Sequence, residues 1–241
     1  MKTGYLKKLL LLALAAVFLV SLASCAAAQP QPKTYTEEET DTWTARCIAD
    51  YAALYQKDAM HFTEVRTYKT EKSERVVSNA QIWFCGSDYL QEEVNYREIR
   101  EHVVTKNGVG FIMQADKDDS EVWTPAASDP YYYFSRHESK WEDRDYTFHS
   151  IEGTEKETKV TFYWDLGDEN CTRSARTFHL EFHYQAETLS RIVFIHTAYN
   201  GSQIDSEKLH MVDTTEYIFH STGESEIIEK IDAAYQKASG K

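Results

Sequence analysis

Eleven short segments in which apolar and polar residues alternate run through most of this chain. A period of two places successive side chains on opposite faces of an extended backbone, so each segment predicts a β-strand. The segments are Phe62–Thr70, Val76–Phe84, Tyr89–Asn95, Ile99–Lys106, Val109–Ala115, Glu121–Thr124, Asp145–Glu152, Lys159–Asp165, Ala175–Gln185, Arg191–Tyr199 and Lys208–His220. Because most of the separators are too short for a crossover, we expect consecutive strands to pair antiparallel.

Asn107-Gly108 separates two of these segments and predicts a tight hairpin. This pair is preferred in type I′ turns because both of its positions tolerate a positive φ. Gly86-Ser87-Asp88 is similarly short, whereas the alternation is lost between Pro125 and Glu142. We expect that longer stretch to be an excursion from the sheet.

Two amphipathic helices are predicted to flank the strands. Thr36 and Glu39 have the spacing of a capping box, and the apolar residues after them recur at helical intervals, which predicts a helix from about Glu37 to Lys57. Ser221 and Glu224 repeat the capping-box spacing before a second helix at the end of the chain. The expected apolar face of this second helix consists of Ile227, Ile228, Ile231, Ala234 and Tyr235.

Several strand centres are apolar on both sides, which limits how the sheet can be covered. Examples are Ile82-Trp83-Phe84 and Phe162-Tyr163-Trp164. Both faces of such strands must be buried. One face could take the two helices, and the other would then need a second layer, a closed interior or a ligand. About eleven antiparallel strands cannot lie flat. We therefore predict an α+β fold with a large curved antiparallel sheet, a half-barrel or barrel, and a helix at each end.

The first residues have the features of an export signal. Lys2, Lys7 and Lys8 precede an apolar run from Leu9 to Val20, and this run is shorter than the roughly 20 residues of a membrane-spanning helix. The sequence Leu22-Ala23-Ser24-Cys25 then resembles the bacterial lipobox, in which the cysteine receives a diacylglycerol before cleavage on its amino side. The resemblance implies an extracytoplasmic lipoprotein, anchored to the bacterial cell membrane by lipid on Cys25. Ordinary secretory cleavage after that cysteine is the alternative.

The residues after Cys25 are mostly small, polar or proline and show no apolar periodicity, which indicates a tether between lipid and domain. We therefore expect a signal peptide in Met1–Ser24, a lipidated tether in Cys25–Tyr35 and a single sheet domain in Thr36–Lys241. Loss of the signal peptide removes three of the 26 basic residues and none of the 39 acidic ones, so the formal charge changes from −13 to −16. Such a charge excludes nucleic acid as a partner.

The order of the predicted elements resembles the lipoprotein-carrier-like fold of exported proteins, an unclosed antiparallel barrel. The resemblance rests on the leading helix from Glu37, the strands that end in Trp123-Thr124-Pro125, and the excursion before the second set of strands. Proteins of that group carry or sense acyl chains inside the barrel. The resemblance therefore implies a non-enzymatic binding module for a lipophilic ligand. The residues that could line the ligand site are Trp83, Phe111, Met113, Tyr163, Trp164 and Phe194.

A surface-tethered module that binds another envelope protein is the second hypothesis. Its contact surface would be the aromatic excursion, because tyrosines on an irregular segment between rigid strands suit a partner surface. The residues of this surface would be Tyr131, Tyr132, Tyr133 and Trp141. An equally weighted interpretation is that these aromatics only cover a sheet edge.

A metal-dependent hydrolase is the third and weakest hypothesis. His179, Glu181 and His183 share one face of a predicted strand, and His196 lies on its expected hairpin partner. Two imidazoles and a carboxylate could hold zinc, but simple alternation of polar and apolar residues also explains the pattern. No nucleophile, metalloprotease or nucleotide-binding motif is present. We therefore predict no catalytic residue, no metal and no cofactor.

Three cysteines remain besides Cys25. Cys47, Cys85 and Cys171 have separations that match no zinc or redox motif. In an exported protein, these three cysteines could form one disulfide and leave one free thiol, or they could form no disulfide.

Overall fold

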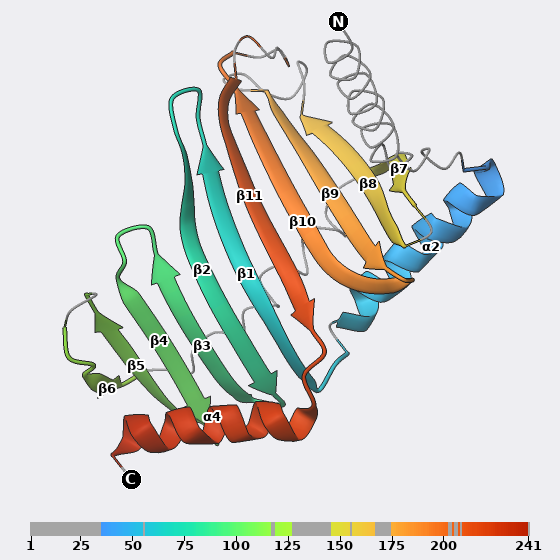
Figure 1. Cartoon of the computed structure of the whole chain (residues 1–241). Coiled ribbons are helices and arrows are strands. Elements are labelled where there is room, and N and C mark those ends of the chain that lie inside the picture. The colour runs from blue at the N-terminus through green and yellow to red at the C-terminus, as the bar shows by residue number, and fades with distance from the viewer. Residues whose placement is uncertain are drawn as a thin grey trace, which may run out of the picture. The chain divides into compact units, whose positions relative to one another are not determined.

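The computed structural model describes residues 35–54, 56–116, 119–126, 146–154, 156–166, 175–201, 204, 207 and 209–240. Its centre is an eleven-stranded antiparallel sheet with two helices (Figure 1). The strands are β1 (Ala59–Lys69), β2 (Glu74–Cys85), β3 (Asp88–Asn95), β4 (Arg100–Lys106), β5 (Val109–Ala115), β6 (Trp123–Pro125), β7 (Thr147–Gly153), β8 (Glu157–Leu166), β9 (Arg176–Gln185), β10 (Thr188–Tyr199) and β11 (Leu209–His220). The helices are α2 (Glu37–Leu54) and α4 (Glu224–Ser239).

The predicted fold class is confirmed, and each predicted strand is present with ends that differ by a few residues. The alternation of apolar and polar residues identified these strands because a half-buried strand has one apolar and one polar face. The hairpin at Asn107-Gly108 is also confirmed, since the two residues have φ values of 51° and 74°. Cys25, the tether up to Thr34 and residues 127–142 of the aromatic excursion lie outside the described residues.

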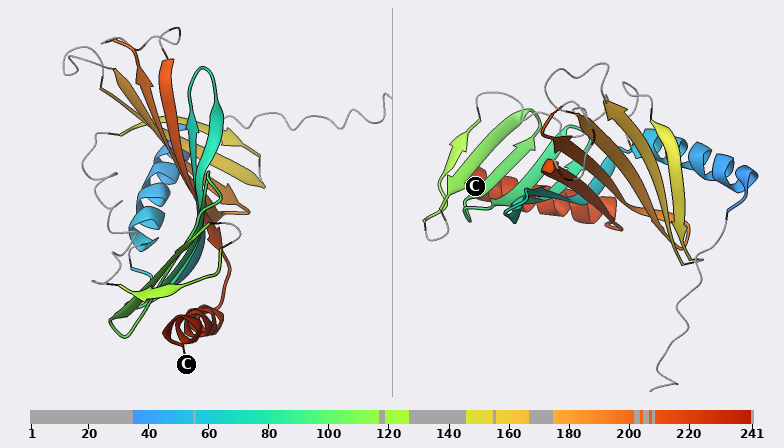
Figure 2. Two further views of the ribbon diagram at one scale, coloured as in Figure 1. Left: turned by 90° about the vertical axis from the view of Figure 1, so that its left-hand side faces the viewer. Right: turned by 90° about the horizontal axis from the view of Figure 1, so that it is seen from above.

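The strands follow the order β6-β5-β4-β3-β2-β1-β11-β10-β9-β8-β7. Each half is thus a meander of sequential hairpins, and the first and last strands of the chain pair at the centre, where His61 faces His220. Strands β6 and β7 are consecutive in the sequence but form the two opposite edges of the sheet (Figure 1). The sheet is therefore open and strongly twisted (Figure 2).

The two helices pack on opposite faces of the sheet, so the prediction that one face could take both is wrong. On β2, Ile82 and Phe84 belong to the core that includes Cys47 of α2, whereas Trp83 packs with Ile227 of α4. Successive strand residues point to opposite faces, which explains the apolar centre of β2 without a second layer. Figure 2 shows the helices on either side of the sheet.

Helix α2 begins with the predicted capping box. The backbone N–H of Glu39 donates to Thr36 Oγ1 at 3.2 Å, and the N–H of Thr36 donates to Glu39 Oε2 at 2.9 Å. The helix ends at Leu54 rather than Lys57. It is fixed to the sheet by Tyr184, whose hydroxyl donates to Asp50 Oδ2 at 3.0 Å.

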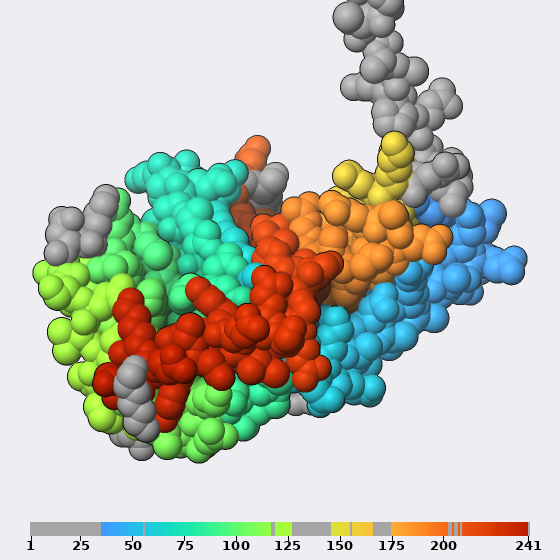
Figure 3. Space-filling view, turned by 60° about the horizontal axis from the view of Figure 1, so that its bottom comes forward, coloured from blue at the N-terminus to red at the C-terminus, as the bar shows by residue number. Residues whose placement is uncertain are grey.

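Helix α4 crosses the strands of the first half, as the red helix in Figure 3 shows. Its N-cap is Gly223, and no side chain caps it, so the predicted capping box of Ser221 and Glu224 is wrong. Ile228 is 39% exposed and does not belong to the buried face. The other predicted apolar residues do pack on the sheet. Neither helix described here has the length and apolarity needed to cross a membrane.

Cys47 and Cys85 are both free thiols in the described structure. Cys47 is fully buried between α2 and the sheet, and burial is the main reason that its pKa is raised to about 12. Such a thiol is protonated at neutral pH and acts as a packing residue. Cys171 lies outside the described residues.

Candidate ligand-binding site

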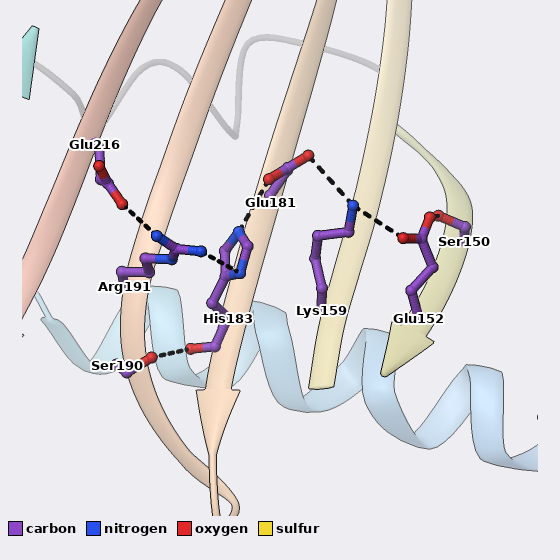
Figure 4. A network of polar contacts seen from close by, with 8 residues as sticks. All are labelled: Ser150, Glu152, Lys159, Glu181, His183, Ser190, Arg191 and Glu216. Carbon is purple, nitrogen blue, oxygen red and sulfur yellow. Dashed lines mark hydrogen bonds and ion pairs between the residues drawn. The ribbon is translucent and has the colours of Figure 1, made fainter. Parts of the chain in front are cut away.

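Polar side chains gather on the face of β7–β11 that lies opposite α2. The strand register places Glu152, Lys159, His183 and Arg191 opposite one another in a row across four strands. Glu181 and Glu216 lie one step further along the same face. Figure 4 shows this network in front of the strands, with α2 behind them. Among the described residues, α4 packs on β1–β6 and leaves this face of β7–β11 without a covering helix.

The six side chains form a continuous chain of polar contacts. Lys159 Nζ lies 3.1 Å from Glu152 Oε2 and 3.8 Å from Glu181 Oε1. At the other end, Arg191 Nη1 donates to Glu216 Oε1 at 2.7 Å. His183 joins the two halves, because its two ring nitrogens contact Glu181 Oε2 at 2.9 Å and Arg191 Nη2 at 3.2 Å.

The contacts of His183 fix its proton. A guanidinium can only donate, so Arg191 requires an unprotonated Nδ1 on His183. The remaining nitrogen, Nε2, therefore carries the hydrogen and donates it to Glu181. In this arrangement the imidazole is neutral: it accepts a hydrogen bond from Arg191 and donates one to Glu181.

Glu181 is held in its charged form. Burial alone would raise the pKa of this carboxyl, but the hydrogen bond from His183 and the nearby Lys159 ammonium outweigh burial, so the pKa lies below its usual range. The side chains of Glu181 and His183 are each 17% exposed, which makes them the least accessible members of the network.

A pocket of about 600 Å³ opens beside this network. Lys159, His183 and Arg191 line it, together with Ile218 and Phe219 at the end of β11 and the turn between β7 and β8. Gly153 is needed in that turn, because a Cβ there would lie 2.0 Å from the carbonyl oxygen of Glu157. The volume is within the range of pockets that bind small molecules.

The six residues predicted to line a lipophilic site do not come together in one cavity. Trp83, Phe111 and Met113 share the α4 face of the first half, where the first two belong to the core beneath that helix. Phe194 lies on the opposite face in the α2 core. Tyr163 and Trp164 are neighbours on β8, so they point to opposite faces. The predicted partner residues Tyr131, Tyr132, Tyr133 and Trp141 lie outside the described residues.

The histidines of the third hypothesis are only partly brought together. His179, Glu181 and His183 do share one face, as predicted. His196 pairs with Phe178 instead and stacks on its ring at 4.7 Å, so it lies on the other face. Both nitrogens of His183 are occupied by protein groups. Within the described ranges, no group of three or more His, Cys, Asp or Glu side chains is placed to hold a metal ion.

Sequence reasoning missed Glu152, Lys159, Arg191 and Glu216 as members of a site. Each lies at a polar position of a strand, and only the register between strands brings them together. Opposite charges at neighbouring cross-strand positions were the available signal, but reading it required knowledge of which residues pair.

The fold and the site together are an open antiparallel sheet with one polar region, on β7–β11, that no described helix covers. No known protein family matches the chain, and no curated protein is significantly similar to it.

Proposed function

We propose that this chain is a membrane-tethered extracytoplasmic lipoprotein that acts as a non-enzymatic binding module, with its ligand on the uncovered face of β7–β11. The observation that carries this proposal is the pocket beside the Glu152-to-Glu216 network. On this face α4 covers β1–β6, whereas over β7–β11 polar groups converge on a hollow of suitable volume. The lipobox-like sequence at Cys25 supports the tether.

Site-specific photo-crosslinking in intact cells tests this proposal. A photoreactive residue at Ser190, which lies on the pocket wall, should give a defined adduct. The same residue at Ser73, exposed in the hairpin between β1 and β2, serves as the control and should give none. Equal labelling from both positions, or none from Ser190, would contradict a binding site on this face.

A lipophilic ligand is the second candidate. This candidate is favoured by three apolar side chains, Trp83, Phe111 and Met113, which share one face of the sheet beneath or beside α4. If α4 moved away from the sheet, an apolar ligand could bind to these side chains. Native mass spectrometry and organic extraction of the mature chain distinguish the two candidates. A reproducible lipid beyond the acyl chains on Cys25 would support the lipophilic ligand, and its absence would remove this candidate.

A further inference from the structure

The pocket beside the polar network is lined by charges of both signs. Its lining includes two carboxylates, Glu152 and Glu157, and two cationic groups, Lys159 and Arg191. His183, the other titratable group of the network on this wall, is held neutral by its contacts. Glu181 and Glu216 also contact these two cations, so carboxylates outnumber cations around the pocket and an anion is not attracted to it. Glu152, Glu181 and Glu216 are each already paired with Lys159 or Arg191, so a cationic ligand would have to displace one of these side chains.

The cationic groups are also already engaged. Lys159 Nζ lies 3.1 Å from Glu152, and Arg191 Nη1 lies 2.7 Å from Glu216. A phosphate or carboxylate ligand would have to compete with these carboxylates. A ligand that displaced Glu216 from Arg191 would leave the partly buried Glu216 carboxylate without its partner, at a cost in binding free energy. The arrangement therefore disfavours an anionic or zwitterionic ligand.

A hydroxyl group can join the network without displacing any member. An ammonium has three donors and a guanidinium has five, while a carboxylate has about four acceptor positions. The contacts of Lys159 and Arg191 described above use only two donors of each. One hydroxyl can accept from a spare N–H and donate to a neighbouring carboxylate, so a rim of adjacent hydroxyls matches a row of alternating donors and acceptors.

The same pocket offers apolar surface at the half-buried Ile218, which is paired with Arg191 on the face of the network, whereas the side chain of Phe219 packs on the α2 core. A sugar ring combines a hydroxyl rim with a face of C–H groups, and it needs both kinds of contact. We infer that this pocket binds a neutral carbohydrate. The inference rests on the proposed function and names its ligand class.

A glycan array of neutral oligosaccharides, followed by calorimetric titration of the best binder, tests the inference. The protein is the mature chain purified from membranes in a polyoxyethylene detergent, because glycosidic detergents would compete. We expect saturable binding whose affinity is nearly unchanged between about 0.05 M and about 0.5 M salt, since the ligand carries no charge to be screened. Inorganic phosphate and triglycine serve as the charged and zwitterionic probes.

Two variants localise the binding. Removing the pocket ion pair in the double variant Glu152→Gln/Lys159→Met should weaken binding about tenfold. The matched control removes the Lys69–Glu74 pair, also 3.1 Å apart, at the other end of the sheet, and should bind as the parent does. Glu157→Gln neutralises one exposed carboxylate of the pocket lining and should also weaken binding. Because Glu157 is exposed, this substitution should leave the fold intact.

Failure of the inference and failure of the proposed function give different results. Absence of saturable binding by any neutral oligosaccharide, or equal affinity in the parent and both pocket variants, overturns the carbohydrate inference. Binding of phosphate or triglycine that the pocket variants weaken also overturns it, but leaves a binding site on this face. Absence of a crosslinked adduct from Ser190 would instead remove the binding site itself.

Discussion

At the scale of single residues, two neighbouring glutamates on β3 have opposite consequences for stability. Glu93 points into the α2 side of the sheet, where burial and then the charge of Glu101 raise the pKa of its carboxyl. The folded state therefore holds this proton more tightly than the unfolded state does, and stability is lost as the pH rises through the unfolded and then the folded pKa. We predict that Glu93→Gln raises the urea midpoint at pH 7, with little change at pH values below both pKa values.

The matched control is Glu92→Gln, one residue away on the opposite face. Glu92 pairs with Lys230 of α4 at 3.0 Å, so its neutralisation should lower the urea midpoint slightly, by less than about 1 kcal/mol in the free energy of unfolding. If both variants changed the midpoint in the same direction, the assignment of the two faces would be wrong.

At the scale of elements, α4 should depend on a narrow apolar stripe. Ile231 is 1% exposed against the sheet, whereas Ile228 is 39% exposed. We predict that Ile231→Ala lowers the free energy of unfolding by about 2–5 kcal/mol. Ile228→Ala should change it by no more than about 0.5 kcal/mol. Chemical denaturation measures both, and similar losses would contradict the observed rotation of the helix.

The junction between β11 and α4 should respond to acid. His61 contacts Thr222 Oγ1 at 2.8 Å and Gln81 Oε1 at 2.9 Å, and its ring lies 4.3 Å from that of His220. Burial is the main cause of its lowered pKa. The hydrogen bond with Gln81 and the charge of Glu226 oppose this lowering, whereas His220 and Lys230 add to it. Because the folded state disfavours the proton, stability should fall as the pH drops from the unfolded pKa toward the folded one. We predict that His61→Gln reduces the loss of unfolding free energy between about pH 7 and pH 5.

The elements themselves could be predicted because their signals are local. Alternation identified each strand, and the Asn107-Gly108 pair identified a turn, without knowledge of the rest of the molecule. The faces on which the helices pack could not be predicted, since Ile82-Trp83-Phe84 is apolar on both sides and fits either arrangement. The polar network required the register of five strands, and the face of His196 within its strand required the same register.

At the scale of the whole molecule, the proposed lipid on Cys25 has to supply the membrane affinity. The sequence from Cys25 onward has a formal charge of −16, which repels anionic headgroups. We predict that Cys25→Ser moves the chain from the membrane fraction to the soluble fraction and abolishes incorporation of labelled palmitate. The purified variant should not bind anionic vesicles even at low salt. Retention of the variant on membranes would show that another segment anchors the chain.

The most direct test of the central claim, a binding site on the uncovered face of β7–β11, is hydrogen–deuterium exchange of the mature chain with and without a concentrated water-soluble extract of its host envelope. The account predicts slower exchange at Glu157–Lys159 and His183–Arg191, the segments that border the pocket, and no change in the hairpin between β1 and β2. Unchanged exchange at the pocket, with protection at another face of the sheet, would contradict it.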